Sequence, residues 1–466
     1  ADKVRSALWI AYPGESGLNA LGRILNGTVS PSGRTVDTWS RDFTEDPVWH
    51  NFGNNLTADG NRYTYMGSVK SSRFIEYREG IYMGYRWFET KAFEEREADP
   101  EWYGDAVVCP FGYGLSYTTF SHSAEPSLPS GSVIGADETL GFTVDVKNIG
   151  SAYAGKEVVQ LYWSSPYTDG GIEKAHVALG DFAKTELLAP GESGRVTLSL
   201  SARDMASYDY DDANGDGHAG YELEAGEYTV YIGGDAHSWA DGTTPRFTYT
   251  VPGDGYVYDT DDATSADITP LFTDESEYME GKLLSREDNF ANYDTIKGVV
   301  GQREQTAQLR ALIERDMADT PDAPWYSSSA PEQQSRSLSY DKCEVKLYDL
   351  IGKPYDDPLW DDLLDQLTVT EMRTLIEIGN YHTEAIESID KPQTIDPDGP
   401  MGYSLFMGND AVYDTCYYAS ESLVGATWNK DLAEHFGIMI GNESLIGDEK
   451  GDGRTYAGWY APAVNL

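Results

Sequence analysis

Short runs of alternating apolar and polar residues dominate the middle of the chain and most restrict how it can fold. Turn-rich stretches such as AGKE, LAPGESG and LEAGE separate these runs. Side chains that alternate with period two line one face of a β-strand. Repeated short strands over about 110 residues predict an immunoglobulin-like β-sandwich at residues 121–252, for which we expect a structural role. The apolar members of three runs are Phe142, Val144 and Val146, then Val196, Leu198 and Leu200, and then Tyr228, Val230 and Ile232.

The sequence before this sandwich has the pattern of a strand followed by a helix. Residues 4–10 (VRSALWI) predict a buried strand, and Asn19, Leu21 and Leu25 predict a helix after a glycine-containing loop. An α/β layer rarely begins so abruptly. We therefore expect residues 1–120 to be the last part of an α/β domain.

The sequence after the sandwich first loses its periodicity and then becomes helical. Residues 253–355 hold acidic and polar runs, and we expect them to form a long connector. At 363–379 the apolar residues have helical spacing, and Thr368 with Glu371 predicts a capping box where the helix restarts. Strand and helix patterns then alternate to the last residue. This alternation predicts the opening of a βα barrel at 356–466, since a whole barrel needs about 250 residues.

The charge of the chain excludes two classes of partner. There are 78 acidic and 34 basic side chains, which give a formal net charge of -44. A surface of this sign repels phosphate backbones and anionic lipid headgroups. In addition, no apolar run reaches the roughly 18 residues of a membrane-spanning helix. We therefore expect neither nucleic acid nor a membrane as a partner.

Three cysteines are scattered along the chain, at Cys109, Cys343 and Cys416. They are odd in number and have no C-x-x-C spacing, so they indicate neither a disulfide framework nor a zinc site. The first residues show no basic region followed by an apolar run and a cleavage site. We expect a cytoplasmic, bacterial protein, with secretion left open because we also expect residues to precede Ala1.

Three groups of motifs follow one another along the chain. The motifs are YPGESGLNALGRILNGTVSPSGRTVDTW (12–39), EGIYMGYRWFET (79–90) and CPFGYGLSYTTF (109–120); VDVKNIGSAYAGKEVVQLY (144–162) and LEAGEYTVYIG (223–233); and LLDQLTVTEM (363–372), DGPMG (398–402), ATWNKDLAEHFG (426–437) and GWYAPAVNL (458–466). Together they resemble glycoside hydrolase family 3. The first group is similar to the closing part of the family's αβα sandwich domain, the second to its fibronectin type III domain, and the third to the opening of its (β/α)8 barrel. The barrel comes last, as in the permuted branch of the family.

This resemblance implies a retaining, exo-acting β-glucosidase that hydrolyses terminal non-reducing β-D-glucosyl residues of short glucosides. It implies no cofactor, and its partners would be a small oligosaccharide or glucoside and the remainder of the same enzyme. A homo-oligomer is compatible with the sequence. We expect the nucleophilic Asp and the acid/base Glu to lie outside residues 1–466, so no residue here is assigned a catalytic role. The alternatives are a β-xylosidase of the same family and a non-catalytic carbohydrate-binding or scaffolding protein.

The resemblance also implies one sugar contact within the chain. Asp398 in DGPMG matches the Asp that holds hydroxyls of the terminal glucose ring, although a lone DGP is otherwise typical of a turn. Ser404 stands where the family commonly has Arg. Tyr460 falls where the family places a residue that lines the same subsite, although a barrel-core aromatic is equally compatible. Tyr381 and His382 follow the first barrel helix and are candidates for the sugar entrance, with a plain surface loop as the alternative.

A calcium loop is the remaining motif to weigh. Asp212, Asn214 and Asp216 alternate as in the first half of such a loop, but position twelve is Leu223 rather than a bidentate Glu. We interpret the stretch as an extended hairpin loop and expect no metal.

Overall fold

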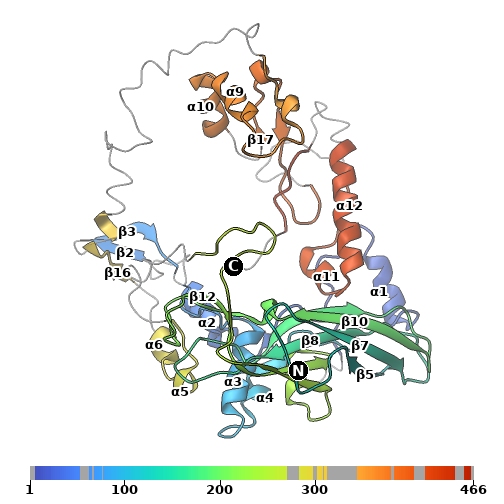
Figure 1. The fold of residues 1–466 in the computed structure, drawn as a ribbon. Coiled ribbons are helices and arrows are strands. Elements are labelled where there is room, and N and C mark those ends of the chain that lie inside the picture. Colours follow the sequence, from blue (N-terminus) through green and yellow to red (C-terminus); the bar gives the residue numbers. More distant parts are fainter. Residues whose placement is uncertain are drawn as a thin grey trace. The chain divides into compact units, whose positions relative to one another are not determined.

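The computed structural model describes the chain in segments that form two compact units (Figure 1). The sandwich unit contains Arg23–Asp316 and Ala426–Asn429. The helical unit contains Ala1–Gly22, Met317–Gly425 and Lys430–Leu466. The described residues are 6–52, 62–65, 68–75, 77–269, 283–297, 302–307, 309–311, 344–378, 382–403, 415–446 and 456–462.

Two β-sheets form the centre of the sandwich unit (Figure 1). Every strand pair in them is antiparallel except β6 with β14, which is parallel. The smaller sheet has the order β10-β7-β5, with β5 at Phe120–Pro126, β7 at Thr139–Asn148 and β10 at Ser193–Ser201. The larger sheet has the order β6-β14-β13-β8-β9, with β6 at Ser132–Val133, β8 at Val158–Ser164, β9 at Ala178–Lys184, β13 at Gly226–Gly233 and β14 at Arg246–Val251.

The alternating runs of the sequence form the core between these sheets. Val144 of β7 lies opposite Val196 of β10, and both pack in one buried cluster with residues of β8, β13 and β14. The cluster contains all nine apolar residues of the alternating runs, and each has at most 9% of its surface exposed. Burial of a Val or Leu side chain contributes about 1.5–3 kcal/mol, so this core is the main source of stability for the sandwich.

A small third sheet, β11-β12-β15, adjoins the sandwich core through Leu223 and Tyr258. Its strands are β11 (Ser207–Asp209), β12 (Gly220–Leu223) and β15 (Tyr256–Tyr258). The stretch at 210–219 connects β11 to β12, so the extended hairpin loop is confirmed. Oxygens of Asp209 accept the backbone N–H groups of Asp211, Ala213 and Asn214, at 3.1–3.4 Å. The Asp209 carboxylate therefore organises the backbone of the loop. The described segments contain no group of three or more His, Cys, Asp or Glu side chains that could hold a metal ion.

Helices and short strands cover the N-terminal part of the sandwich unit. The helices α3 (Tyr85–Glu95), α4 (Trp102–Ala106), α5 (Glu287–Phe290) and α6 (Tyr293–Lys297) surround a second core with Tyr82, Trp87 and Phe88 at its centre. Residues of the expected connector thus take part in this core. The remaining described elements of the sandwich unit are β1 (Trp39–Ser40), η1 (Phe43–Glu45), α2 (Pro47–Phe52), β2 (Arg62–Tyr65), β3 (Ser68–Arg73), β4 (Val107–Cys109), η2 (Arg203–Met205), η3 (Ala236–Ala240) and β16 (Gln302–Glu304).

The helical unit contains the predicted helix restart. The helix α9 (Leu359–Asp365) ends before Thr368, and α10 (Val369–Glu377) begins after it. The Thr368 side chain accepts the backbone N–H of Glu371 at 3.2 Å, while Glu371 accepts the backbone N–H of Thr368 at 2.8 Å. The capping box is therefore confirmed. The other elements of the unit are α1 (Leu18–Leu25, whose last residues lie in the sandwich unit), η6 (Leu347–Leu350), β17 (His382–Thr383), η7 (Glu387–Ile389), β18 (Thr394–Ile395), α11 (Glu421–Gly425) and α12 (Lys430–Ile446).

One expected strand is not present. Residues 6–10 have no regular structure, Leu8 and Trp9 are 42% and 44% exposed, and residues 4 and 5 lie outside the described residues. A buried strand needs neighbouring strands to satisfy its backbone, and none of the described strands pairs with residues 6–10. The apolar run alone was therefore not sufficient to predict a strand. Within the described part of the chain, no helix has the length and apolar character to cross a lipid bilayer.

Candidate functional site

The segment around Asp398 pairs with the segment around Tyr460. These two residues form a parallel bridge, and Ile395 of β18 forms another with Tyr456. The Gly399 N–H donates to the Tyr460 carbonyl at 3.2 Å, and the Tyr460 N–H donates to the Pro397 carbonyl at 3.1 Å. Two positions that the sequence assigned to one sugar subsite therefore lie side by side on neighbouring, parallel segments.

Glycine is required where these two segments meet. A Cβ atom on Gly399 would lie 2.5 Å from the Cβ of Ala461 and 2.9 Å from the carbonyl oxygen of Tyr460. Real Cβ atoms do not approach other atoms so closely, so a side chain here would push the segments apart. The backbone N–H of Gly399 also donates to Oδ1 of Asp398 at 3.1 Å, which helps to orient that carboxylate.

The exposure of Asp398 and Tyr460 differs. Asp398 is half-buried, and the preceding Pro397 is buried. The Tyr460 side chain is 53% exposed in this chain. A partly buried carboxylate beside a partly exposed aromatic ring combines the two kinds of surface that saccharides contact.

His382 lies on the other side of β18. It belongs to β17, where it pairs with Ile395, and its Nε2 atom lies 3.0 Å from Oε1 of Glu384. The structure thus brings His382, Asp398 and Tyr460 onto three adjacent segments. The other two candidates, Tyr381 and Ser404, lie outside the described residues.

The short strands of this region pack on α12. Tyr403, Ile440 and Tyr456 form a buried cluster with Ile395 and Phe436 against it. Ile440 and Phe436 of α12 supply the helix side of this packing, whereas Leu432 of the same helix is 44% exposed. This is strand-on-helix packing, and the described strands do not form a closed barrel.

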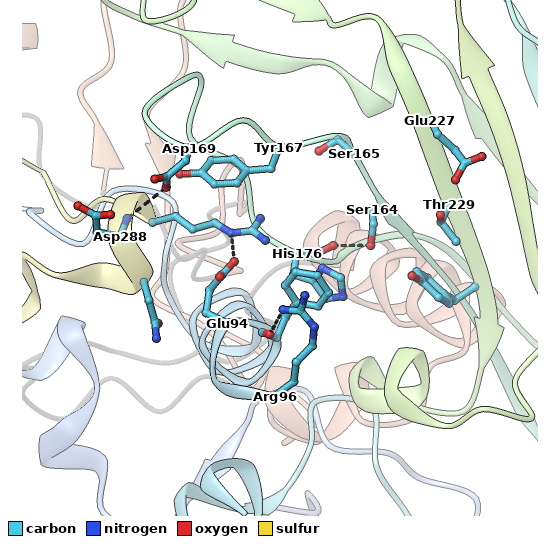
Figure 2. A pocket seen from close by; sticks show the side chains of 14 residues that line it. Glu94, Arg96, Ser164, Ser165, Tyr167, Asp169, His176, Glu227, Thr229 and Asp288 are labelled. Atoms are coloured by element: carbon cyan, nitrogen blue, oxygen red, sulfur yellow. Dashed lines mark hydrogen bonds and ion pairs between the residues drawn. The ribbon is translucent and has the colours of Figure 1, made fainter. Parts of the chain in front are cut away.

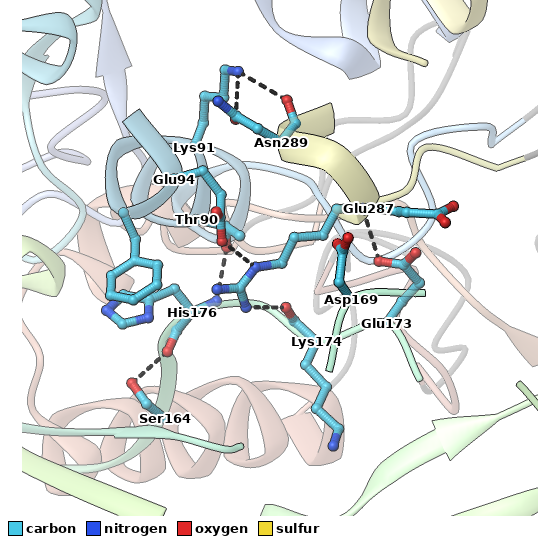
Figure 3. Close-up of polar contacts among 12 residues, drawn as sticks. Thr90, Lys91, Glu94, Ser164, Asp169, Glu173, Lys174, His176, Glu287 and Asn289 are labelled. Carbon is cyan, nitrogen blue, oxygen red and sulfur yellow. Dashed lines mark hydrogen bonds and ion pairs between the residues drawn. The ribbon is translucent and has the colours of Figure 1, made fainter. Parts of the chain in front are cut away.

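A buried polar network in the sandwich unit was not predicted from the sequence (Figure 3). Arg286 donates from Nε to Glu94 at 2.7 Å and from Nη1 to the Lys174 carbonyl at 3.0 Å. The carboxylate of Glu173 accepts the Arg286 N–H at 3.0 Å and the hydroxyls of Tyr82 and Ser285 at 2.5 Å each. Burial, and next the charge of Glu173, raise the pKa of Tyr82 far above its usual value. These residues are too far apart in sequence for any local pattern to connect them.

A second buried carboxylate, that of Glu89, lies on α3 in the same unit. Glu89 has no exposed surface, and it accepts hydrogen bonds from Tyr103 Oη at 2.6 Å and Trp239 Nε1 at 2.7 Å. The Nδ1 atom of His237 lies 2.8 Å from the same carboxylate. These three partners stabilise the buried carboxylate, and through them Glu89 connects α3 to η3.

Comparison with known proteins identifies two domains in the chain. Residues 1–85 match the glycosyl hydrolase family 3 C-terminal domain, and residues 157–236 match the fibronectin type III-like domain. The predicted β-sandwich is thus confirmed as a fibronectin type III-like domain.

Relatives with these domains are β-glucosidases by name. β-Glucosidase A of Butyrivibrio fibrisolvens is 30% identical over 482 residues, which cover 100% of this chain and 51% of that protein. A β-glucosidase of Ruminococcus albus is 39% identical over 234 residues, covering 50% of this chain and 20% of the relative. The crystal structure of a β-glucosidase from Paenibacillus barengoltzii matches with a TM-score of 0.57 and 27% identity, over 93% of this chain and 41% of that chain. The chain thus spans about half the length of the first relative. Its matched domains are those of glycoside hydrolase family 3 proteins and its relatives are β-glucosidases by name, so the resemblance to that family is confirmed.

Proposed function

We propose that the complete protein containing these residues is a retaining, exo-acting β-glucosidase that releases terminal non-reducing glucose from short β-glucosides. The observation that carries the proposal is the 30% identity to β-glucosidase A across the whole of this chain. Because that alignment includes the sandwich unit and the helical unit together, it supports one enzyme rather than a binding module that happens to share a domain. In this proposal residues 1–120 close an αβα sandwich, and residues 356–466 open a (β/α)8 barrel.

Asp398 is proposed to hold the terminal sugar. An ionised carboxylate accepts two hydroxyl donors at once through charge-assisted hydrogen bonds. Its position beyond β18 would correspond to the C-terminal end of a barrel strand, where the active sites of such barrels lie. Tyr460, on the adjacent segment, would then contact the same ring, and His382 would lie at the sugar entrance.

The bond cleavage itself needs two further carboxylates. Retaining glycosidases place them about 5–5.5 Å apart, one as the nucleophile and one as the acid/base. We assign neither role to residues 1–466. The contribution of this chain would be to bind and orient the sugar, so that an attacking carboxylate meets it in a reactive position.

The test is turnover by the full-length enzyme of an aryl β-glucoside and an aryl β-xyloside. We expect the glucoside to be the better substrate, because the relatives are β-glucosidases by name. Dominant xyloside turnover would favour the β-xylosidase, and a full-length protein that turns over neither would favour a non-catalytic role.

The role of Asp398 is tested by Asp398→Ala with Asp361→Ala, on the first turn of α9, as the control. Loss of a charge-assisted contact that strengthens in the transition state costs on the order of 3 kcal/mol, and each 1.36 kcal/mol is tenfold in rate. We expect kcat/KM to fall by a factor of hundreds for Asp398→Ala and to stay within about twofold for the control. Near-normal activity of Asp398→Ala would leave Asp398 as a turn residue only.

A further inference from the structure

The sandwich unit contains a pocket of about 750 Å³ that lies between the end of α3 and the fibronectin type III-like domain. Its wall on the domain side is β13, where Glu227, Thr229 and Tyr231 alternate along the strand and all line the pocket. Ser164 of β8 is the partner of Thr229 in the sheet and continues the wall. Figure 2 shows Glu227 and Thr229 across the pocket from Tyr167 and Asp169. The volume lies within the roughly 300–1,000 Å³ of small-molecule sites.

His176 occupies the centre of this group of side chains (Figure 2). It is 8% exposed, and its ring stacks on Phe93 with centroids 3.8 Å apart. Burial and then the nearby Arg286 and Arg96 hold its pKa well below the usual value, so the ring is neutral. Its Nε2 atom is buried and has no hydrogen-bond partner among the described residues. A buried polar atom without a partner is unfavourable for folding.

The charged side chains of the pocket restrict the ligand it can bind. Arg286 and Glu94 neutralise one another through their 2.7 Å contact. The guanidinium of Arg96 remains, and it lies 3.7 Å from the centroid of the Phe93 ring. The lining also has three further carboxylates, those of Asp169, Glu227 and Asp288. An anion would meet these carboxylates and a cation would meet Arg96, whereas a neutral ligand is repelled by neither. Because carboxylates are in excess, a cation is the rival ligand.

A neutral ligand with many hydroxyl groups fits this mixture of donors and acceptors. Carboxylates accept from hydroxyls, whereas Arg96, Ser165 and Thr229 donate to them, and a saccharide hydroxyl can do both. Tyr231 is buried at one end of β13 and Glu227 is exposed two positions beyond Thr229, so the wall changes from apolar at depth to polar at the rim.

We propose that this pocket is a second saccharide-binding site, which binds a short β-glucoside independently of Asp398. The choice of a gluco-configured ligand rests on the proposed function, whereas the choice of a neutral polyhydroxylated ligand rests on the pocket itself. The fibronectin type III-like domain then has a binding role as well as the structural role expected from its sequence. Because the end of α3 and Arg286 supply part of the lining, the site also requires residues outside the matched fibronectin type III-like domain.

The experiment measures binding of cellobiose and cellotriose to the full-length protein carrying Asp398→Ala, by calorimetry at two salt concentrations. We expect one saccharide per chain to remain bound, with an affinity that changes less than twofold between 50 and 500 mM salt, as for a neutral ligand. Adding Glu227→Gln, or Ser165→Trp to fill the pocket, should weaken this binding at least tenfold. Glu186→Gln is the matched control, because the side chain of Glu186 is 95% exposed on the same domain and does not line the pocket.

The pocket substitutions are also made in the otherwise unchanged enzyme. There we expect turnover of a small aryl β-glucoside to stay within about twofold, since none of the pocket residues belongs to the proposed sugar-binding group of Asp398, Tyr460 and His382. Saccharide binding that persists in Ser165→Trp and Glu227→Gln, or preferential binding of spermidine or glucuronate, would overturn the proposal. So would the absence of any binding to the Asp398→Ala protein. A protein without glucosidase activity that still binds cellobiose through Glu227 would instead refute only the proposed function.

Discussion

A buried ion pair between Arg34 and Glu157 offers a sharp test of what holds the sandwich unit together. The two side chains are 5% and 9% exposed, and Nη2 of Arg34 lies 2.8 Å from Oε2 of Glu157. At that distance, with an effective dielectric constant of about 20, their attraction is about 6 kcal/mol. Desolvation costs several kcal/mol for each ion, so the intact pair contributes little net stability. Removing one partner is a different case, because the remaining charge stays buried.

We therefore expect Arg34→Met to destabilise this region by about 3–5 kcal/mol. The carboxylate of Glu157 would retain only His122, whose Nε2 atom lies 3.6 Å away, as its ionic partner among the described residues. The double variant with Glu157→Leu should recover to within about 1 kcal/mol of the wild type, because neither charge is then left alone.

The assay is amide hydrogen exchange of β8 and β9, read peptide by peptide, because a protein with several domains does not unfold in one two-state step. A loss of 3 kcal/mol accelerates exchange by about 150-fold at 1.4 kcal/mol per factor of ten. Lys156→Ala serves as the control, since its partner Glu186 is 95% exposed, and it should change stability by less than about 1 kcal/mol. If the double variant exchanges as fast as Arg34→Met, the attraction exceeds the desolvation cost and the reasoning is wrong.

Three further predictions concern other contacts. Trp428→Ala should destabilise the sandwich unit by about 3–5 kcal/mol, because this 4% exposed ring contacts Phe111 and Phe182. Hydrogen exchange of β9 measures this loss of stability, and Trp428→Phe is the milder comparison. Burial and then Arg34 lower the pKa of Lys184 to about 8, so between pH 8 and 9.5 the unfolded chain binds a proton that the folded one has lost. Stability of the wild type relative to Lys184→Met should therefore rise with pH in that window, and a constant difference in exchange rates would contradict the shift. Gly399→Ala should reduce glucoside turnover about as much as Asp398→Ala, because its Cβ would separate the paired segments while leaving the carboxylate present; unchanged kcat/KM would exclude that packing argument.

Local patterns predicted those elements whose cause is local. Thr368 and Glu371 form the predicted capping box because both partners lie within one helical turn. Val144 and Val196 meet across the core because strand alternation fixes the buried face of each strand. The strand at 4–10 failed for the opposite reason, since a strand depends on partners elsewhere in the chain.

The parts of the candidate sites that escaped prediction depend on contacts between distant residues. The resemblance identified Asp398 and Tyr460, and the structure places them on paired segments, but their sugar-binding role stays a prediction. Nothing near Arg286 in the sequence indicates that it will meet Glu94, and nothing near His176 indicates Phe93. Similarly, ATWN at 426–429 has the pattern of residues preceding a helix, yet these four residues belong to the sandwich unit.

The membership of Ala426–Asn429 in the sandwich unit has a consequence for synthesis of the chain. The backbone N–H of Arg34 donates to the Ala426 carbonyl at 2.9 Å, and Lys184 donates to the Thr427 carbonyl at 2.6 Å. Arg34 and Lys184 leave the ribosome long before residue 426. About 110 residues lie between Asp316 and Ala426, and their synthesis takes roughly 6 to 22 s at 5–20 residues per second. During that interval Phe111 and Phe182 lack their Trp428 neighbour. The speed of translation through residues 317–425 therefore sets when the sandwich unit becomes complete.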